Sequence, residues 1–154
     1  NNTATLDIAT TEDLTTEGDE TFTLTLTGSG DDISVTINDT SVTYSFTPDY
    51  TISVTNTGNS YNLTGTDRSG AVNGSNNPAI SFNSGDKVRF NINASTSSSH
   101  PFYVKTQSGG GTGNQASGVN GAGTTQVDWT IGSNGTFYYQ CSVHSGMYGQ
   151  INVS

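Results

Sequence analysis

Short runs in which apolar β-branched or aromatic residues alternate with Thr, Ser or Asn recur along almost the whole chain of 154 residues. Clear examples are Ile33-Ser-Val-Thr-Ile37, Val88-Arg-Phe-Asn-Ile92 and Val127-Asp-Trp-Thr-Ile131. Successive side chains of a strand point to opposite faces, so this period of two predicts strands with one face in a core and one in water. No stretch has the 3.6-residue period of an amphipathic helix. We therefore predict an all-β fold, a sandwich of two sheets with little helix.

The predicted strands share this alternation and are separated by turn-forming Gly, Asn, Asp and Ser. They span residues 22–26, 33–37, 42–46, 50–54, 80–82, 88–92, 102–104, 127–131, 137–139 and 151–153. Two stretches rich in Gly, Asn and Ser, residues 65–77 and 108–125, are predicted to be long loops.

The composition fits this fold and excludes several classes of partner. Apolar residues make up 30 % of the chain and charged residues 11 %, whereas a disordered chain of such low hydrophobicity normally carries many charges or prolines. The formal net charge is −9, and nucleic acids and anionic membrane surfaces require clustered positive charge. No apolar run approaches the roughly 20 residues of a membrane span. We expect neither a nucleic-acid partner nor a membrane partner.

Metal-binding side chains gather near the C-terminus. The chain has one Cys, one Met and two His, and three of these four residues are Cys141, His144 and Met147. Thiolate, thioether and imidazole together are the ligands that copper prefers. A Cys at a strand end, followed by His and Met at intervals of three residues, can direct three donors at one point. This pattern predicts a copper site.

A fourth donor has to come from another strand, and His100 is the remaining histidine. It has the same parity as Phe102 and Val104, so we expect it on the inward face of the predicted strand 102–104. Cys141 has the same parity as Tyr139. Two inward-facing strand ends would then bring the four donors together at one end of the sandwich.

Other uses of these residues have to be weighed. A lone Cys is often only a small buried apolar residue, and the domain could have kept the fold and lost the metal. A Cys–His hydrolase needs an oxyanion site and a substrate cleft, which nothing in the sequence marks, so we expect no enzyme and no catalytic residues. Structural zinc is disfavoured because a thioether is a poor zinc ligand.

Two longer motifs extend this pattern, Gly85-Asp-Lys-Val-Arg-Phe-Asn91 and Tyr138-Tyr-Gln-Cys-Ser-Val-His-Ser-Gly-Met-Tyr-Gly-Gln-Ile-Asn-Val153. With His100 they resemble the plastocyanin and amicyanin group of cupredoxins over residues 48–154, and the short Cys-x2-His-x2-Met spacing is similar to that of amicyanin. The resemblance implies a Greek-key sandwich and a type 1 copper site, held by His100, Cys141, His144 and Met147, that exchanges one electron with a redox partner. It departs at Pro101, where the family usually has an Asn whose hydrogen bonds tie the two ligand loops together.

The N-terminal part of the chain has a different character. Residues 6–39 resemble the end of a Calx-β domain, and the resemblance implies calcium binding at five carboxylates. These are Glu12, Asp13, Glu17, Glu20 and Asp39. A solvated acidic turn accounts for the same residues and is the interpretation that we prefer. The expected organisation is residues 1–40 from a Calx-β-like domain, a linker at 41–47 and a cupredoxin-like domain at 48–154.

About forty residues are too few to bury a sandwich core by themselves. We therefore expect self-association or a neighbouring domain to complete the N-terminal sandwich, in a larger protein that is extracellular or lies on a cell or virion surface. Three functions stay open. One is a copper-binding, electron-transferring module. Another is a structural or adhesive subunit of a surface fibre or virion, in which the copper site is structural or vestigial. The third is a carbohydrate- or calcium-dependent adhesion domain that uses the acidic turn.

Overall fold

The computed structural model describes residues 20–25, 32–37 and 44–154. The chain divides into two compact units, Asn1–Ser45 and Phe46–Ser154. In the first unit β1 (Glu20–Thr25) and β2 (Asp32–Ile37) pair antiparallel, with Phe22 opposite Val35. The assignment of each predicted domain to a family stays a prediction.

Most of the predicted calcium ligands cannot be placed. Glu12, Asp13, Glu17 and Asp39 lie outside the described residues, and Glu20 is described only as the first residue of β1. Calcium binding therefore stays a prediction.

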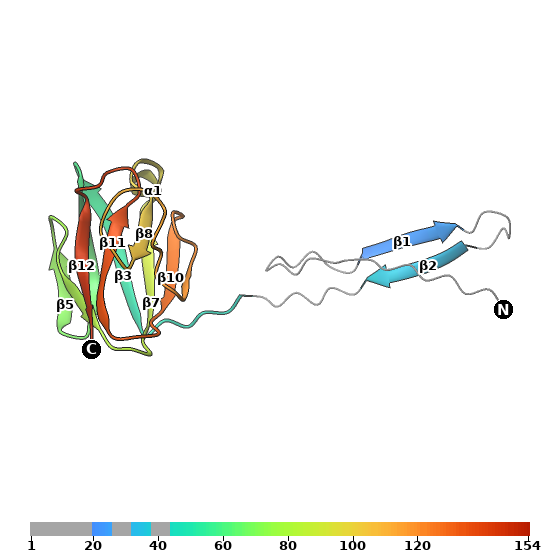
Figure 1. Cartoon of the computed structure of the whole chain (residues 1–154), viewed down its shortest axis with the longest axis horizontal. Coiled ribbons are helices and arrows are strands. Elements are labelled where there is room, and N and C mark those ends of the chain that lie inside the picture. Colours follow the sequence, from blue (N-terminus) through green and yellow to red (C-terminus); the bar gives the residue numbers. More distant parts are fainter. Residues whose placement is uncertain (1–19, 26–31, 38–43) are drawn as a thin grey trace. The chain divides into compact units, whose positions relative to one another are not determined.

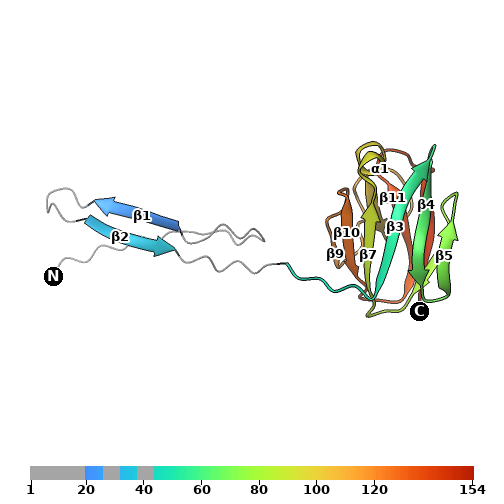
Figure 2. The same cartoon turned by 180° about the vertical axis from the view of Figure 1, so that it is seen from behind.

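The second unit is a sandwich of two sheets (Figures 1 and 2). One sheet has six strands in the order β5-β4-β3-β7-β10-β9, and the other has four in the order β6-β12-β11-β8. The strand bounds are β3 (Tyr50–Thr57), β4 (Ser60–Asp67), β5 (Gly70–Gly74), β6 (Ile80–Phe82), β7 (Lys87–Ile92), β8 (Phe102–Lys105), β9 (Val119–Asn120), β10 (Gln126–Thr130), β11 (Gly135–Cys141) and β12 (Tyr148–Val153). This confirms the predicted all-β, two-sheet fold.

The predicted alternation is what fills the core. Along β7 the side chains of Val88, Phe90 and Ile92 are buried, and the residues between them are not. Phe102 of the four-stranded sheet lies in the middle of an aromatic cluster, with ring centroids 5.0 Å from Phe90 and 5.6 Å from Tyr139. Aromatic pairs at such separations add to the stabilisation from burial. The cluster lies beneath the predicted metal ligands, because Phe102 pairs with Cys141 across the sheet.

The structure differs from the sequence-based expectation at residues 65–77. This stretch is not a long loop, because β4 runs to Asp67 and pairs antiparallel with β5. Glycine and asparagine are depleted in strands, which is why strand propensity misses it. At Gly65 glycine is needed, since a Cβ there would collide with the Thr51 carbonyl of β3.

Smaller differences lie elsewhere in the chain. Residues 44–46 belong to no strand, so the predicted strand 42–46 is wrong over its described part. The loop 108–125 contains the two-residue strand β9. The one helix of the described residues is α1 (Ala94–Ser99), which has six residues. No helix in the described part of the chain is long and apolar enough to cross a membrane.

The net charge of the chain belongs to its N-terminal unit. Residues 1–45 contain nine Asp and Glu and no Lys or Arg, so they account for the whole net charge of −9. The second unit is neutral overall, with four carboxylates and four cations: Asp49, Asp67, Asp86, Asp128, Arg68, Lys87, Arg89 and Lys105. Long-range electrostatic attraction of a cation or basic partner would therefore come from the first unit.

Candidate metal centre

His100 is positioned by the short helix α1 rather than by a strand. Asn93 caps the helix, its side-chain oxygen accepting a hydrogen bond from the backbone N–H of Ser95. The N–H of His100 ends the helix by donating to the carbonyl of Thr96 at 2.7 Å. The prediction that His100 faces inward is confirmed, since its side chain is buried. Its predicted place on the strand is wrong, because β8 begins only at Phe102.

The opposite sheet also holds His100 in place. The Tyr61 hydroxyl of β4 donates to the His100 carbonyl at 2.7 Å, and Tyr61 is fully buried. Burial is the main cause that raises the pKa of Tyr61 far above its usual value, and the nearby Cys141 thiol is the next cause. The phenol therefore stays protonated and remains a hydrogen-bond donor. Sequence reasoning missed Tyr61, because nothing local to a strand indicates which distant carbonyl its hydroxyl meets.

Cys141 is the last residue of β11, and the loop that follows it returns to β12. Two backbone hydrogen bonds close the loop, Cys141 N–H to the Met147 carbonyl at 2.9 Å and Met147 N–H to the His144 carbonyl at 3.0 Å. The N–H of Ser142 donates to the Pro101 carbonyl at 3.1 Å. The two ligand segments are therefore tied by a backbone bond at Pro101, where the resemblance leads one to expect a side-chain bond.

Three of the predicted ligands converge on one point. His100 Nδ1 and His144 Nδ1 are 3.1 Å apart, and the Cys141 Sγ is 3.9 Å from the first and 3.5 Å from the second. A triangle with these sides has a point about 2 Å from each corner, close to metal–nitrogen bond lengths of about 2.0–2.1 Å and slightly short of a metal–thiolate bond of about 2.3 Å. His100, Cys141 and His144 therefore form a group that could hold a metal ion.

Met147 is fully buried and belongs to the same apolar core as Cys141. Its backbone is held next to the ligands by the two loop bonds just described. Its role as an axial ligand stays a prediction.

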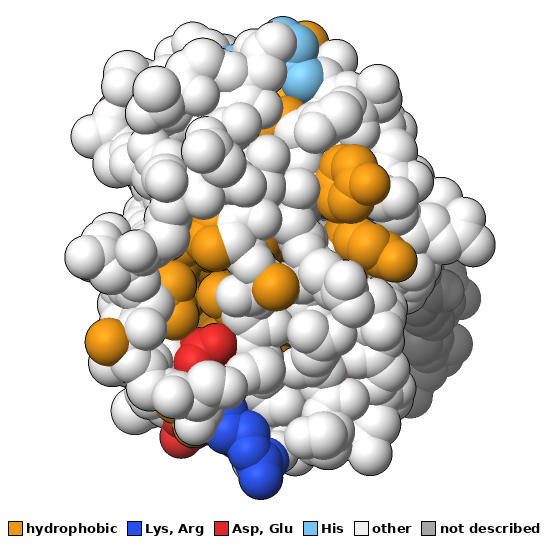
Figure 3. Space-filling view, turned by 90° about the vertical axis from the view of Figure 1, so that its left-hand side faces the viewer, with side chains coloured by type: hydrophobic (Ala, Val, Ile, Leu, Met, Phe, Trp, Pro, Cys, Tyr) orange, Lys and Arg blue, Asp and Glu red, His pale blue; other side chains and the backbone are white. Residues whose placement is uncertain are grey.

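The group is buried on one side and close to solvent on the other. The Cys141 and His100 side chains are buried, whereas that of His144 is only half-buried. Figure 3 shows histidine side-chain atoms at one end of the visible surface, far from its Asp, Glu, Lys and Arg side chains. His144 is therefore the ligand candidate nearest to solvent.

The electrostatics keep the buried imidazole neutral. Burial, and then the neighbouring His144, lower the pKa of His100 from its usual value of 6.5. A neutral imidazole has a free lone pair on one nitrogen, which is the form that binds metals. His100 is thus held in its metal-binding protonation state at neutral pH.

This pKa shift predicts that the metal-free protein loses stability when the pH falls from about 7.5 to about 5. Between the lowered folded pKa and the unfolded value of 6.5, the unfolded chain binds more protons than the folded one. Stability therefore rises with pH across that window and is fully present above it. Urea unfolding at both pH values checks this. His100→Gln should flatten the dependence, and an unchanged slope in that variant would contradict the prediction.

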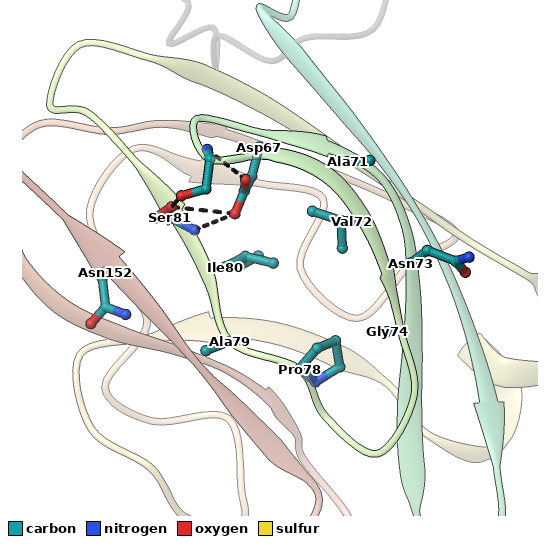
Figure 4. A pocket seen from close by; sticks show the side chains of 11 residues that line it. Asp67, Ala71, Val72, Asn73, Gly74, Pro78, Ala79, Ile80, Ser81 and Asn152 are labelled. Carbon is teal, nitrogen blue, oxygen red and sulfur yellow. Dashed lines mark hydrogen bonds between the residues drawn. The ribbon is translucent and has the colours of Figure 1, made fainter.

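A hollow of about 320 Å³ lies between β5 and β6 (Figure 4). Asp67 is the carboxylate on its lining, and both carboxylate oxygens already accept hydrogen bonds. Oδ1 accepts from the N–H of Ser69 at 2.7 Å, and Oδ2 accepts from the N–H of Ser81 at 2.8 Å. We therefore assign Asp67 a structural role, because it joins the edge of one sheet to β6 of the other, and we assign it no ligand-binding role.

No protein-family model matches the chain, and no curated protein matches it either. Its description rests on its own geometry, which is a β-rich two-sheet sandwich with a buried His-Cys-His group.

Proposed function

We propose that residues 46–154 form a copper-binding module of the cupredoxin type that transfers single electrons. The observation that carries this proposal is the two-nitrogen, one-sulfur triangle of His100, His144 and Cys141. A plane of two imidazoles and a thiolate with a weak axial Met is the ligand set of blue-copper sites, and Met147 supplies the thioether in the proposed site.

The donor set favours copper over the commoner alternatives. Carboxylates, which Mg²⁺ and Ca²⁺ require, are absent from the His-Cys-His group. Zinc accepts imidazole and thiolate, but its structural sites are usually four-coordinate and use no thioether. A soft, buried thiolate suits copper in its lower oxidation state, while the imidazoles suit both states.

The residues of the chain have separate roles in this proposal. Copper in such a site would supply reversible one-electron chemistry. Cys141 and His100 hold it from the buried side, and the half-buried His144 forms the edge nearest to a redox partner. The bonds from Tyr61 to the His100 carbonyl and from Ser142 to the Pro101 carbonyl fix the two ligand segments before a metal arrives. A site that changes little between oxidation states lowers the barrier to electron transfer.

Copper loading tests the proposal directly. Protein incubated with Cu(II) and freed of excess metal should hold one copper per chain and show an intense visible band from thiolate-to-copper charge transfer. Ascorbate should bleach the band and air should restore it. A colourless copper-loaded protein, or one that retains zinc but not copper, would contradict the proposal.

The second candidate is a structural or adhesive subunit of an extracellular fibre or virion surface. Among the described residues, β1 and β2 pair only with each other, and an isolated two-stranded hairpin is marginally stable in water. This supports completion of the N-terminal unit by a neighbouring domain or a second chain. The two candidates are compatible, and failure of the loading experiment would leave the structural role alone.

A further inference from the structure

Two buried polar side chains near the metal centre belong to neither the core nor the ligand set. Lys105 of β8 is 2 % exposed and Gln140 of β11 is fully buried. In β11 the core-facing residues are Tyr139 and Cys141, so Gln140 points to the other face of the sheet. Polar side chains buried on an outer sheet face have to be covered by another part of the chain, and hydrogen bonds identify it as the glycine turn 109–111.

The Gln140 amide forms hydrogen bonds to several backbone carbonyls of the ligand loop. Its Nε2 donates to the carbonyls of Cys141 at 2.9 Å, His144 at 3.0 Å and Met147 at 3.1 Å, and lies 3.5 Å from that of Ser145. An amide has two protons, so these bonds are shared among the carbonyls. One side chain thus contacts the backbone of three of the four proposed ligand residues.

Lys105 holds the glycine turn against the same amide. Its Nζ donates to the carbonyls of Gly109 at 2.6 Å and Gly111 at 3.1 Å, with Gly110 at 3.4 Å. Among the described residues no carboxylate forms an ion pair with it, so these carbonyls take the place of a counter-ion. A buried ammonium without such partners would be strongly disfavoured.

The glycine turn also holds the Gln140 amide and the ligand loop in place. The N–H of Gly109 donates to Gln140 Oε1 at 2.9 Å, and the N–H of Gly111 donates to the Ser142 carbonyl at 2.6 Å. The first bond determines which end of the amide faces the loop, because a flipped amide would set its oxygen against the loop carbonyls. The network therefore runs from Lys105 through the glycine turn and Gln140 to the ligand loop.

We propose that Gln140 and Lys105 are positioning residues that hold the 141–147 loop in its metal-binding conformation before the metal binds. Gln140 acts directly on the loop, and Lys105 acts through the glycine turn. This inference rests on the proposed function only for the identity of the metal, copper. The ordering of the loop by Gln140 and Lys105 concerns the metal-free protein and does not depend on which metal binds.

Substitution of Gln140 by Met tests the proposal, because Met has a similar length and no hydrogen-bonding group. Copper release to an excess of chelator should become about 10–100-fold faster, the range typical when a hydrogen bond that orients a metal ligand is lost, and the visible band should shift. Gln140→Glu, which keeps the shape but loses the donors, should behave like Gln140→Met. The matched control is Gln150→Met. Gln150 is an exposed glutamine on β12 whose amide donates to Asn152, and the variant should release copper at the wild-type rate.

Amide hydrogen exchange in the metal-free protein separates this inference from the copper proposal. In Gln140→Met the N–H groups of Cys141 and Met147 should exchange at least about tenfold faster, the equivalent of one lost hydrogen bond, while those of β3 and β7 stay protected. Lys105→Met should show the same pattern and replaces Gln140→Met if that variant does not fold. If the wild type takes up no copper, the proposed function fails and exchange still decides this inference. Wild-type exchange at both amides in the folded variants would overturn it.

Discussion

Replacing Cys141 by serine is expected to abolish the visible band of the copper-loaded protein and to weaken copper binding by more than about 100-fold. That loss exceeds the usual effect of removing a hydrogen bond that only orients a metal ligand. The thiolate is the soft anionic donor of the site, whereas a serine hydroxyl stays protonated and binds copper poorly. Serine is close to cysteine in size, so the fully buried position can still accommodate it. Competition with a chelator of known affinity measures the loss, and the absorption spectrum reports the band.

The control for this substitution lies in the same loop. Ser145 is exposed, and Ser145→Ala should leave both the band and the affinity at wild-type values. Circular dichroism of Cys141→Ser should show the wild-type β signal, which would establish that the metal is lost and not the fold. A serine variant that keeps the affinity of the wild type would remove Cys141 from the ligand set, and the proposed copper site with it.

Replacing Phe102 by alanine is expected to lower the free energy of unfolding of the metal-free protein by about 3–5 kcal/mol. Phe102 is fully buried, and its ring lies 5.2 Å from that of Tyr61 and 5.6 Å from that of Tyr139 between centroids. Its removal leaves a cavity that these large neighbours cannot fill without leaving their own positions. A small domain has about 5–15 kcal/mol of stability in total, so the loss is a large share of it.

Urea unfolding of the metal-free protein measures the Phe102→Ala effect without any contribution from metal binding. Val143→Ala is the control, because Val143 is 64 % exposed and such surface changes stay within about 0.5 kcal/mol. Because Phe102 pairs with Cys141 and follows His100 by two residues, its loss should also weaken copper binding. A Phe102→Ala variant that loses less than about 1 kcal/mol would show that the aromatic cluster is not the centre of the core.

The sequence predicts the fold well where strands follow the ordinary rule. Each predicted strand from Tyr50 onward overlaps an observed one, because alternating Val, Ile, Phe and Tyr have to turn one face to the core. The rule fails at β4 and β5, which contain Gly and Asn. Gly65 is required because the Thr51 carbonyl of the neighbouring strand lies too close for a side chain. Such a contact between strands cannot be recognised from the residues next to Gly65 in the sequence.

The composition of the candidate metal site was within reach of the sequence alone, because the side chains that bind soft metals are rare in this chain and three of them cluster within seven residues. The sequence therefore determined the donor types, the loop that carries Cys141, and the alternation that builds the sandwich. Only the tertiary structure decided how His100 reaches Cys141 and His144, since a helix end, and not strand parity, places its ring. It also decided what holds the loop. The N–H of Gly109 donates to the Gln140 side chain 31 residues away in sequence, and Lys105 donates to carbonyls of the same glycine turn. Such a long-range hydrogen bond exists only once the strands and the glycine turn are packed.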